Sequence, residues 1–233
     1  MMAAKTPARL VVAVTGASGS FYAYRTLQLL SPLEIEVHLV MSSAARRTLV
    51  TETDLRAEQL EEAADVVHSA SDIGASIASG SFRTLGMMVV PCSIKTLSEI
   101  ANGITGSLIS RAADVVLKER RRLVLMVRET PLHAGHLRSM SSVTEMGGII
   151  CPPVPAMYAR PRDITQIVDH SVSRALDLFG LDTGSLRRWG EDLDTLPSSR
   201  SRKPVGEQSP DGPPVRVPRD MPSTNLWEAT YRQ

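Results

Sequence analysis

The feature that most constrains the fold of this chain is a short apolar run followed at once by a glycine-rich turn. Residues 9–14 are rich in β-branched side chains without polar alternation, which is typical of a strand buried on both faces. The turn over residues 15–20 reads Thr-Gly-Ala-Ser-Gly-Ser, and residues 21–30 have a helical pattern. A strand, a glycine turn and a helix in this order predict the repeating unit of a parallel α/β sheet.

The same alternation continues along the chain. We predict further strands at residues 35–41, 85–91, 123–127 and 147–151, and further helices at residues 44–50, 108–119, 136–146 and 164–179. A turn at residues 92–96 opens a helix that runs to Ile100, and residues 58–66 form another amphipathic segment. Five strands alternating with helices predict a single doubly wound α/β domain with a parallel sheet. Ligands of such sheets bind in the loops at the carboxyl ends of the strands.

The composition excludes several classes of function. Lysine and arginine number 26 against 25 aspartates and glutamates, so the net charge of +1 gives no overall case for binding nucleic acid or an anionic membrane. The chain has no run of about 18 apolar residues, and its first apolar run is too short for a signal peptide. We therefore expect a cytoplasmic protein.

The two cysteines, Cys92 and Cys151, are too few for a disulfide framework or a four-cysteine zinc site. None of the five histidines forms a recognisable cysteine–histidine signature with Cys92. We expect Cys92 to be a buried packing residue rather than a nucleophile.

Proline marks a change in the chain near residue 191, because seven of the 15 prolines follow it. The same region has few aliphatic side chains to offset the entropy of ordering. We expect a flexible leader at residues 1–8, a folded domain at residues 9–191, and a C-terminal extension at residues 192–233 that is disordered or docked on a neighbouring subunit.

Small hydroxyl-bearing turns follow three of the predicted strands. They contain Gly16, Ala17 and Ser18, then Ser42, and then Ser93, Ile94, Lys95 and Thr96. Glycine permits close backbone approach, and the N–H groups at the start of the next helix favour an anion, so the three turns together indicate a phosphorylated cofactor. The dinucleotide fingerprint and the Walker loop are both absent. A purely structural role for each turn stays open.

A second set of residues is mostly basic and lies on several segments: Arg111, Lys118, Arg128, Glu129, Tyr158 and Arg174. Arg111 and Lys118 are seven residues apart, so one face of a helix can carry both. The set either forms surface salt bridges or converges on a second phosphate. Glu52 is one further acid of interest, and its alternative role is a solvated or capping carboxylate.

At this point the motifs resemble a known family, the UbiX-type flavin prenyltransferases. The resemblance covers residues 9–191 and is carried by the motifs at residues 15–19, 51–54, 78–82, 91–97, 111–114, 117–121, 127–133 and 152–158. It implies a Rossmann-like, flavodoxin-type three-layer fold and a homododecamer. It also implies an activity, the joining of a dimethylallyl group from dimethylallyl phosphate to reduced FMN. The product, prenylated FMN, serves a UbiD-type decarboxylase.

The resemblance also implies residue roles. The positions that match FMN-binding residues are Gly16, Ala17, Ser18, Ser42, Ser93, Ile94, Lys95, Thr96 and Arg128. Those that match the pocket for the dimethylallyl phosphate headgroup are Arg111, Lys118, Arg128, Glu129, Tyr158 and Arg174. Those expected to take part in catalysis are Ser18, Glu52, Lys118 and Glu129. No metal is expected, because protein cations can stabilise the departing phosphate.

Two departures and two alternatives accompany the resemblance. Met157-Tyr158-Ala159 replaces the usual aromatic triplet but keeps the tyrosine, and the chain continues past Glu191, where the family usually ends. The first alternative is a flavin-dependent cysteine decarboxylase, whose distinctive histidine and asparagine loop are not evident. The second is a non-catalytic FMN-binding partner of an aromatic-acid decarboxylase.

Overall fold

The computed structural model describes residues 7–192 of the chain, so the predictions for residues 1–6 and 193–233 lie outside the described residues. The strands are β1 Ala8–Val14, β2 Ile35–Met41, β3 Val66–Ser69, β4 Gly86–Cys92, β5 Arg122–Val127 and β6 Ile149–Ile150. The α-helices are α1 Ser20–Leu30, α2 Ser43–Glu52, α3 Ala57–Glu61, α4 Ile94–Ala101, α5 Leu108–Lys118, α6 Ala134–Glu145 and α7 Ile164–Asp177. Two short 3-10 turns, η1 Ser76–Ala78 and η2 Met157–Ala159, complete the list.

The strands form one parallel sheet in the order β3-β2-β1-β4-β5-β6. β1 pairs with β2 along its whole length, from Ala8 opposite Ile35 to Val14 opposite Met41. The chain runs outward from β1 to β3 on one side and from β4 to β6 on the other, so the order reverses between β1 and β4. This confirms the predicted doubly wound fold and places its switch point beside the glycine turn.

The sheet has six strands among the described residues, and the prediction of five was wrong because it missed β3. The sequence analysis assigned residues 58–66 to one amphipathic segment, whereas a five-residue helix, α3, ends at Glu61 and β3 begins at Val66. β3 is a short edge strand whose residues alternate between half-buried and exposed. β3 is defined by its pairing with β2, which runs from His38 opposite Val66 to Met41 opposite Ser69. Four residues are too few to show a clear hydrophobic period in the sequence.

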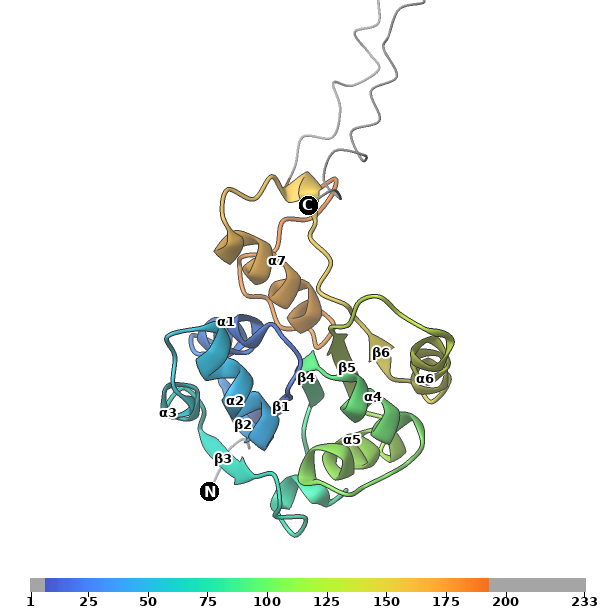
Figure 1. Cartoon of the computed structure of the whole chain (residues 1–233). Coiled ribbons are helices and arrows are strands. Elements are labelled where there is room, and N and C mark those ends of the chain that lie inside the picture. Colours follow the sequence, from blue (N-terminus) through green and yellow to red (C-terminus); the bar gives the residue numbers. More distant parts are fainter. Residues whose placement is uncertain (1–6, 193–233) are drawn as a thin grey trace, which may run out of the picture. The chain divides into compact units, whose positions relative to one another are not determined.

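Two apolar cores cover the two faces of the sheet. Leu10, Val12 and Val14 of β1 pack with α1, α2 and α7, whereas Val11 and Ala13 pack with α4, α5 and α6. Figure 1 shows the first helices (blue and cyan) and the later ones (green) as two groups beside the strands. The first strand is therefore buried on both faces, as its uniform apolar sequence predicted.

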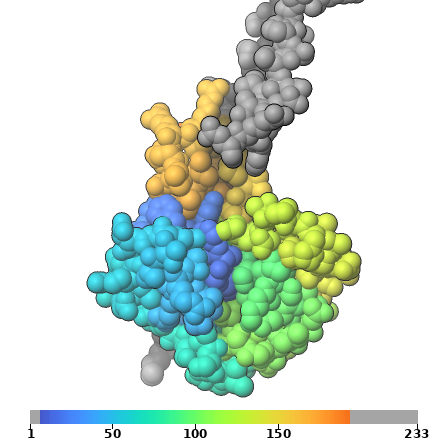
Figure 2. Space-filling view, viewed as in Figure 1, coloured from blue at the N-terminus to red at the C-terminus, as the bar shows by residue number. Residues whose placement is uncertain are grey.

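α7 is longer than the other helices and packs mainly on α1, where Arg25 and Asp169 form an ion pair with 2.6 Å between Nε and Oδ1. Figure 2 shows the segment that contains α7, in orange, standing out from the main body. Across residues 7–192, every helix is too short or too polar to cross a membrane.

Candidate active site at the carboxyl edge of the sheet

Thr15 joins the carboxyl ends of β1 and β4, on the two sides of the switch point. Its hydroxyl donates to the carbonyl oxygen of Pro91 at 2.7 Å and accepts from the backbone N–H of Ser93 at 2.8 Å. The N–H of Ser42 in turn donates to the carbonyl of Val14 at 3.0 Å. The three hydroxyl-bearing turns therefore lie together at one edge of the sheet, as predicted.

Gly16 allows the first turn to approach the start of α2. A Cβ added at Gly16 would lie 2.5 Å from the Cβ of Ala44, too close for two carbon atoms. The backbone N–H groups of Gly16, Ala17 and Ser18 have no acceptor within residues 7–192. Three consecutive unpaired donors on a half-buried turn can bind an anion or the edge of a polar ring.

Glu52 occupies the N-terminus of α1. Its carboxylate accepts from the backbone N–H of Gly19 and of Ser20, both at 2.9 Å. Partial burial raises the pKa of Glu52, but the hydrogen bonds from Ser18, Ser20 and Gly19 together outweigh burial and hold that pKa below its ordinary value. Glu52 is therefore ionised at neutral pH, and it caps the start of α1, which is the alternative role that the sequence analysis gave it.

Arg128 crosses from the end of β5 to the first turn. Its Nε donates to the carbonyl oxygen of Ser18 at 3.1 Å, and its own N–H donates to the carbonyl of Cys92 at 3.1 Å. Arg128 is half-buried and forms no ion pair with a carboxylate among the described residues, so its remaining guanidinium donors stay available. Glu129 follows it on the exposed side and accepts from the N–H of Thr130 at 2.9 Å.

Ser42 and Ser93 cap the N-termini of α2 and α4. Ser42 Oγ accepts from the N–H of Ala45 at 3.0 Å, and Ser93 Oγ accepts from the N–H of Thr96 at 3.3 Å. Thr96 is buried beside Ser93, with 3.2 Å between their hydroxyl oxygens. Lys95 points along α4 to Glu99, with 2.6 Å between Nζ and Oε1, so only its backbone belongs to this edge. Ile94 packs against the core.

The second predicted set of residues does not come together within one chain. Lys118 is the last residue of α5, where it pairs with Glu119 beside Gly80. Arg111 pairs with Asp114 on the same helix, at 2.8 Å between Nη1 and Oδ2. Because β5 begins four residues after α5 ends, Lys118 lies near the amino ends of the strands, away from Arg128.

Tyr158 and Arg174 lie on the segment around α7. The ring of Tyr158 meets the rings of His170 and Trp189 edge-on, with centroids 5.6 and 5.5 Å away. Arg174 is exposed and donates to Asp177 at 3.2 Å. Neither residue is hydrogen-bonded to the turns at residues 16–18, 42 and 93–96.

The cysteines behave as packing residues. Cys92 is completely buried, and burial raises the pKa of its thiol far above the usual range. Burial also raises the pKa of Cys151, and nearby Arg174 partly opposes this. Neither is a thiolate at neutral pH, which agrees with the predicted role of Cys92.

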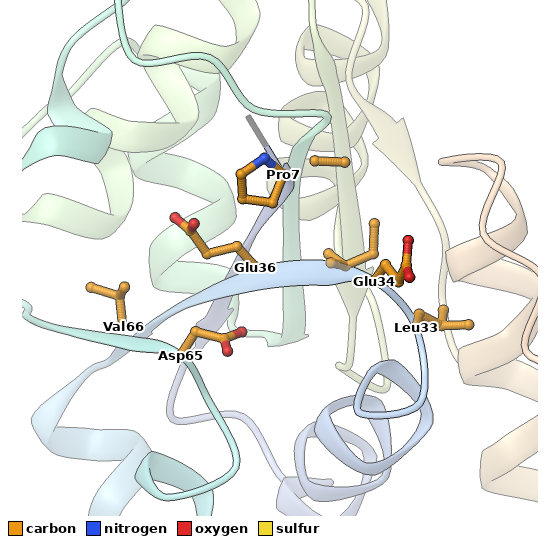
Figure 3. Close-up of a pocket in the computed structure, with 8 residues that line it drawn as sticks. Pro7, Leu33, Glu34, Glu36, Asp65 and Val66 are labelled. Carbon is orange, nitrogen blue, oxygen red and sulfur yellow. The ribbon is translucent and has the colours of Figure 1, made fainter. Parts of the chain in front are cut away.

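A cavity of about 820 Å³ lies at the opposite, amino edge of the sheet (Figure 3). Glu34, Glu36 and Asp65 line it, so its charge is negative and unsuited to a phosphorylated ligand. Within residues 7–192, no group of three histidine, cysteine, aspartate or glutamate side chains is placed to hold a metal ion. The loops at the carboxyl edge are therefore the better candidate site.

Their composition fits a phosphorylated flavin. We name as the carboxyl-edge loops residues 16–18, Ser42, residues 93–96 and Arg128, which supply unpaired N–H groups, hydroxyls and one half-buried guanidinium at a topological switch point. Fold and loops together define a flavoprotein of the α/β class. The sequence profile of the Flavoprotein family matches residues 2–176.

Closer relatives specify the family further. "Flavin prenyltransferase UbiX" from Escherichia coli strain K12 is 56% identical over 174 residues, which cover 74% of this chain and 92% of the relative. The crystal structure of AnUbiX (PadA1) in complex with FMN and dimethylallyl pyrophosphate is 52% identical, with a TM-score of 0.78, and covers 79% of this chain and 98% of that one. A dodecameric FMN-dependent UbiX-like decarboxylase from Escherichia coli O157:H7 is 47% identical, with a TM-score of 0.76 over 78% of this chain and 98% of that one.

The chain belongs to the UbiX family of flavin prenyltransferases. It is an enzyme of the transferase class, and the alternative of a flavin-dependent cysteine decarboxylase is set aside. The sequence analysis named capping as an alternative role of Glu52 but did not identify the helix that it caps, because the contact joins residues more than 30 positions apart. Gly19, the second glycine of the turn, has a φ of 110°, which favours glycine.

Proposed function

We propose that the carboxyl-edge loops hold reduced FMN while a dimethylallyl group is transferred from dimethylallyl phosphate to its N5 and C6 atoms. When bound, reduced FMN would supply the nucleophile: N5 would lose its proton and bond to the allylic carbon as phosphate leaves with the electron pair of the carbon–oxygen bond. Closure onto C6 would follow when the remaining carbon–carbon double bond takes up a proton and C6 loses its own. The observation that carries the proposal is the row of unpaired N–H groups at Gly16, Ala17 and Ser18, in the turn to which the Arg128 side chain is hydrogen-bonded. These donors match a polar ring edge and a phosphate ester.

Glu52 is the proposed proton acceptor near the reacting flavin. Its lowered pKa means that it enters the reaction ionised, so it is suited to remove a proton rather than to supply one. Ser18 lowers that pKa through its side chain and belongs to the carboxyl-edge loops, so it is the proposed relay. Arg128 and Glu129 are the proposed neighbours of the donor's headgroup on the same side.

We infer that the remaining residues for the headgroup come from neighbouring copies of this chain. A departing phosphate needs cations, yet Lys118 lies near the amino ends of the strands, and Lys118 and Arg174 are each already paired with a carboxylate. An oligomer brings such surface residues of one copy to the edge of another, and a relative of 47% identity is dodecameric. A homododecamer with shared sites is therefore the assembly that we propose, with Arg111 supporting and Tyr158 contacting the headgroup.

The activity is tested by mass. The protein is incubated anaerobically with reduced FMN and dimethylallyl phosphate, and the released flavin is weighed. A gain of one prenyl group supports the proposal, whereas unchanged FMN would favour the non-catalytic FMN-binding partner. A parallel reaction with dimethylallyl diphosphate decides which donor is used, since the related crystal structure contains the pyrophosphate.

Shared sites are tested by complementation between two inactive variants. Lys118→Ala should impair use of the donor but leave FMN bound, whereas Arg128→Ala should also weaken FMN binding. If Lys118 acts in a neighbour's site, co-expression of the two variants should restore part of the prenyl transfer, because mixed assemblies contain some sites with both residues intact. Activity no higher than that of either variant alone would contradict the shared site, provided that size-exclusion chromatography shows mixed assemblies.

The prenylated flavin is the proposed cofactor of a UbiD-type decarboxylase in the cytoplasm. This follows from the resemblance and from the chemistry of the product, which is a modified cofactor rather than a metabolic end point. The test is to add the reaction mixture to an apo decarboxylase of that type. Decarboxylation that depends on both the prenyl donor and this protein supports the assignment.

A further inference from the structure

A polar cavity lies between the loop before α7 and the segment after it. Its volume is about 610 Å³, and three of its lining residues are arginines: Arg160, Arg162 and Arg187. Ala159, Pro161, Gln166, Asp169, His170 and Ser185 complete the lining. The cavity contains none of the residues assigned above, although Tyr158 lies beside it, with its hydroxyl 3.5 Å from the carbonyl oxygen of Arg187. This segment stands out from the body in Figure 2.

The charge of the cavity is positive and uncompensated within the described part of the chain. None of the three arginines has a carboxylate within ion-pair distance there, in contrast to Arg174 and Arg188, which both pair with Asp177. The one acidic lining residue, Asp169, is bound on both oxygens by Arg25, at 2.6 and 2.8 Å. Nη1 of Arg187 makes one long hydrogen bond to the carbonyl oxygen of Ala159, at 3.5 Å, and the other guanidinium donors of the three arginines are left to solvent or to a ligand.

Neutral groups add further donors. The side-chain oxygen of Gln166 accepts from the N–H of Arg162 at 3.0 Å, which leaves its NH₂ group available, and the hydroxyl of Ser185 lines the same cavity. Nε2 of His170 donates to the backbone carbonyl oxygen of Arg187 at 3.3 Å, so the imidazole does not occupy the guanidinium donors of the arginines. The available groups are thus mainly donors.

Arg160 holds an uncommon backbone conformation at this cavity. Its φ is 50°, in the left-handed region that only one other non-glycine residue within 7–192 adopts. Such a conformation costs roughly 1–2 kcal/mol for an ordinary residue, and glycine would avoid that cost. The position nevertheless carries an arginine, and this residue lines the cavity.

We propose that this arginine pocket, defined as Arg160, Arg162, Arg187, Gln166 and Ser185, binds the phosphoryl group of a small phosphate compound. Guanidinium groups pair with phosphate oxygens through two parallel hydrogen bonds, and the volume suits a small-molecule ligand. The pocket is separate from the carboxyl-edge loops. The inference rests on the proposed function only for its two candidate sources of phosphate, the dimethylallyl phosphate donor and the released inorganic phosphate.

The test is calorimetric titration of the full chain loaded with oxidised FMN, so that the flavin site is filled and no transfer consumes the ligand. Inorganic phosphate and dimethylallyl phosphate are titrated separately into the Lys118→Ala protein, which weakens the proposed donor site. The pocket variant adds Arg160→Gln and Arg187→Gln. The control adds Arg56→Gln and Arg138→Gln, two exposed arginines outside the pocket, with the same loss of charge.

The pocket variant should bind at least roughly tenfold more weakly than the control, because two charge-assisted contacts are lost. Binding of both compounds identifies the phosphoryl group alone as the ligand, and binding of the ester only identifies the donor. Equal affinities of pocket variant and control, or no binding to either, would overturn the inference. If the double substitution prevents folding, Ser185→Ala with Gln166→Ala replaces it. Prenyl transfer by the wild-type protein is measured separately, so failure of the proposed function has its own readout.

Discussion

Replacing Gly16 by alanine tests whether the approach of the first turn to α2 shapes the flavin site. The φ of Gly16 lies outside the left-handed region, so alanine is allowed by the backbone and the contact alone decides the effect. The new Cβ would lie 2.5 Å from the Cβ of Ala44, with backbone atoms of Ala44 at 3.3 and 3.4 Å. Carbon atoms at rest are about 3.5–4 Å apart, so the turn or α2 must move by about 1 Å.

Overpacking of this kind costs about 1–3 kcal/mol, which lowers Tm by about 2–12 °C in a domain of this size. The displaced atoms belong to the turn with unpaired N–H groups and to the helix capped by Ser42, so FMN affinity should fall by roughly tenfold or more. Calorimetry and flavin fluorescence titration measure the two effects.

Gly106→Ala is the matched control, since no atom lies within 4 Å of its added Cβ and its φ is also ordinary. An Ala44→Gly background should reduce the cost of Gly16→Ala, because the two changes share one contact. Wild-type stability and wild-type FMN affinity in the Gly16→Ala protein would refute this account of the turn.

Two further predictions concern titratable groups. Glu52→Gln should destabilise the protein by about 1 kcal/mol at neutral pH, because a charge is lost from the N-terminus of α1. Because the pKa of Glu52 is lowered in the folded state, its carboxylate contributes fully to the free energy of unfolding above the unfolded-state pKa of about 4.3. This contribution is lost as the pH falls through the lower pKa of the folded state. The difference from wild type in chemical denaturation should therefore disappear in acid, and a constant difference would contradict the assignment. Cys92 should resist alkylation by iodoacetamide at pH 8 in the native protein and react in denaturant, whereas Cys151, which is only half-buried, should react sooner. If peptide mass spectrometry shows that Cys92 is alkylated rapidly in the native protein, the thiol is accessible to solvent and the prediction is contradicted.

The fold was largely predictable because its central strands are buried on both faces. β1, β4 and β5 are nearly continuous apolar runs, and β2 is mainly apolar but contains Glu36 and His38; each boundary was placed within about one or two residues. β3 escaped because an edge strand needs no continuous apolar sequence, and β6 is shorter than predicted, with only Ile149 and Ile150 paired. Edge strands are defined by pairing with a neighbour, which a local pattern does not record.

The site was predictable where it depends on position after a strand. Ser42 and Ser93 were found because turns after parallel strands meet at one edge. The contact of Glu52 with Gly19 was not found, because it depends on how α2 packs beside α1. Lys118 shows the opposite limit: motif resemblance places it in one pocket with Arg128, but within a single chain it lies near the amino ends of the strands and pairs with Glu119.

The carboxylate of Glu52 has a consequence for turnover. A flavin that is modified and released must leave its site after every cycle. A turn whose conformation depended only on hydrogen bonds to the flavin's phosphate would lose those bonds each time. In this enzyme the start of α1 is already neutralised by a side chain of the protein, which remains in place when the product departs. The hydrogen bonds to Glu52 thus hold the turn in a binding-competent conformation between one flavin and the next.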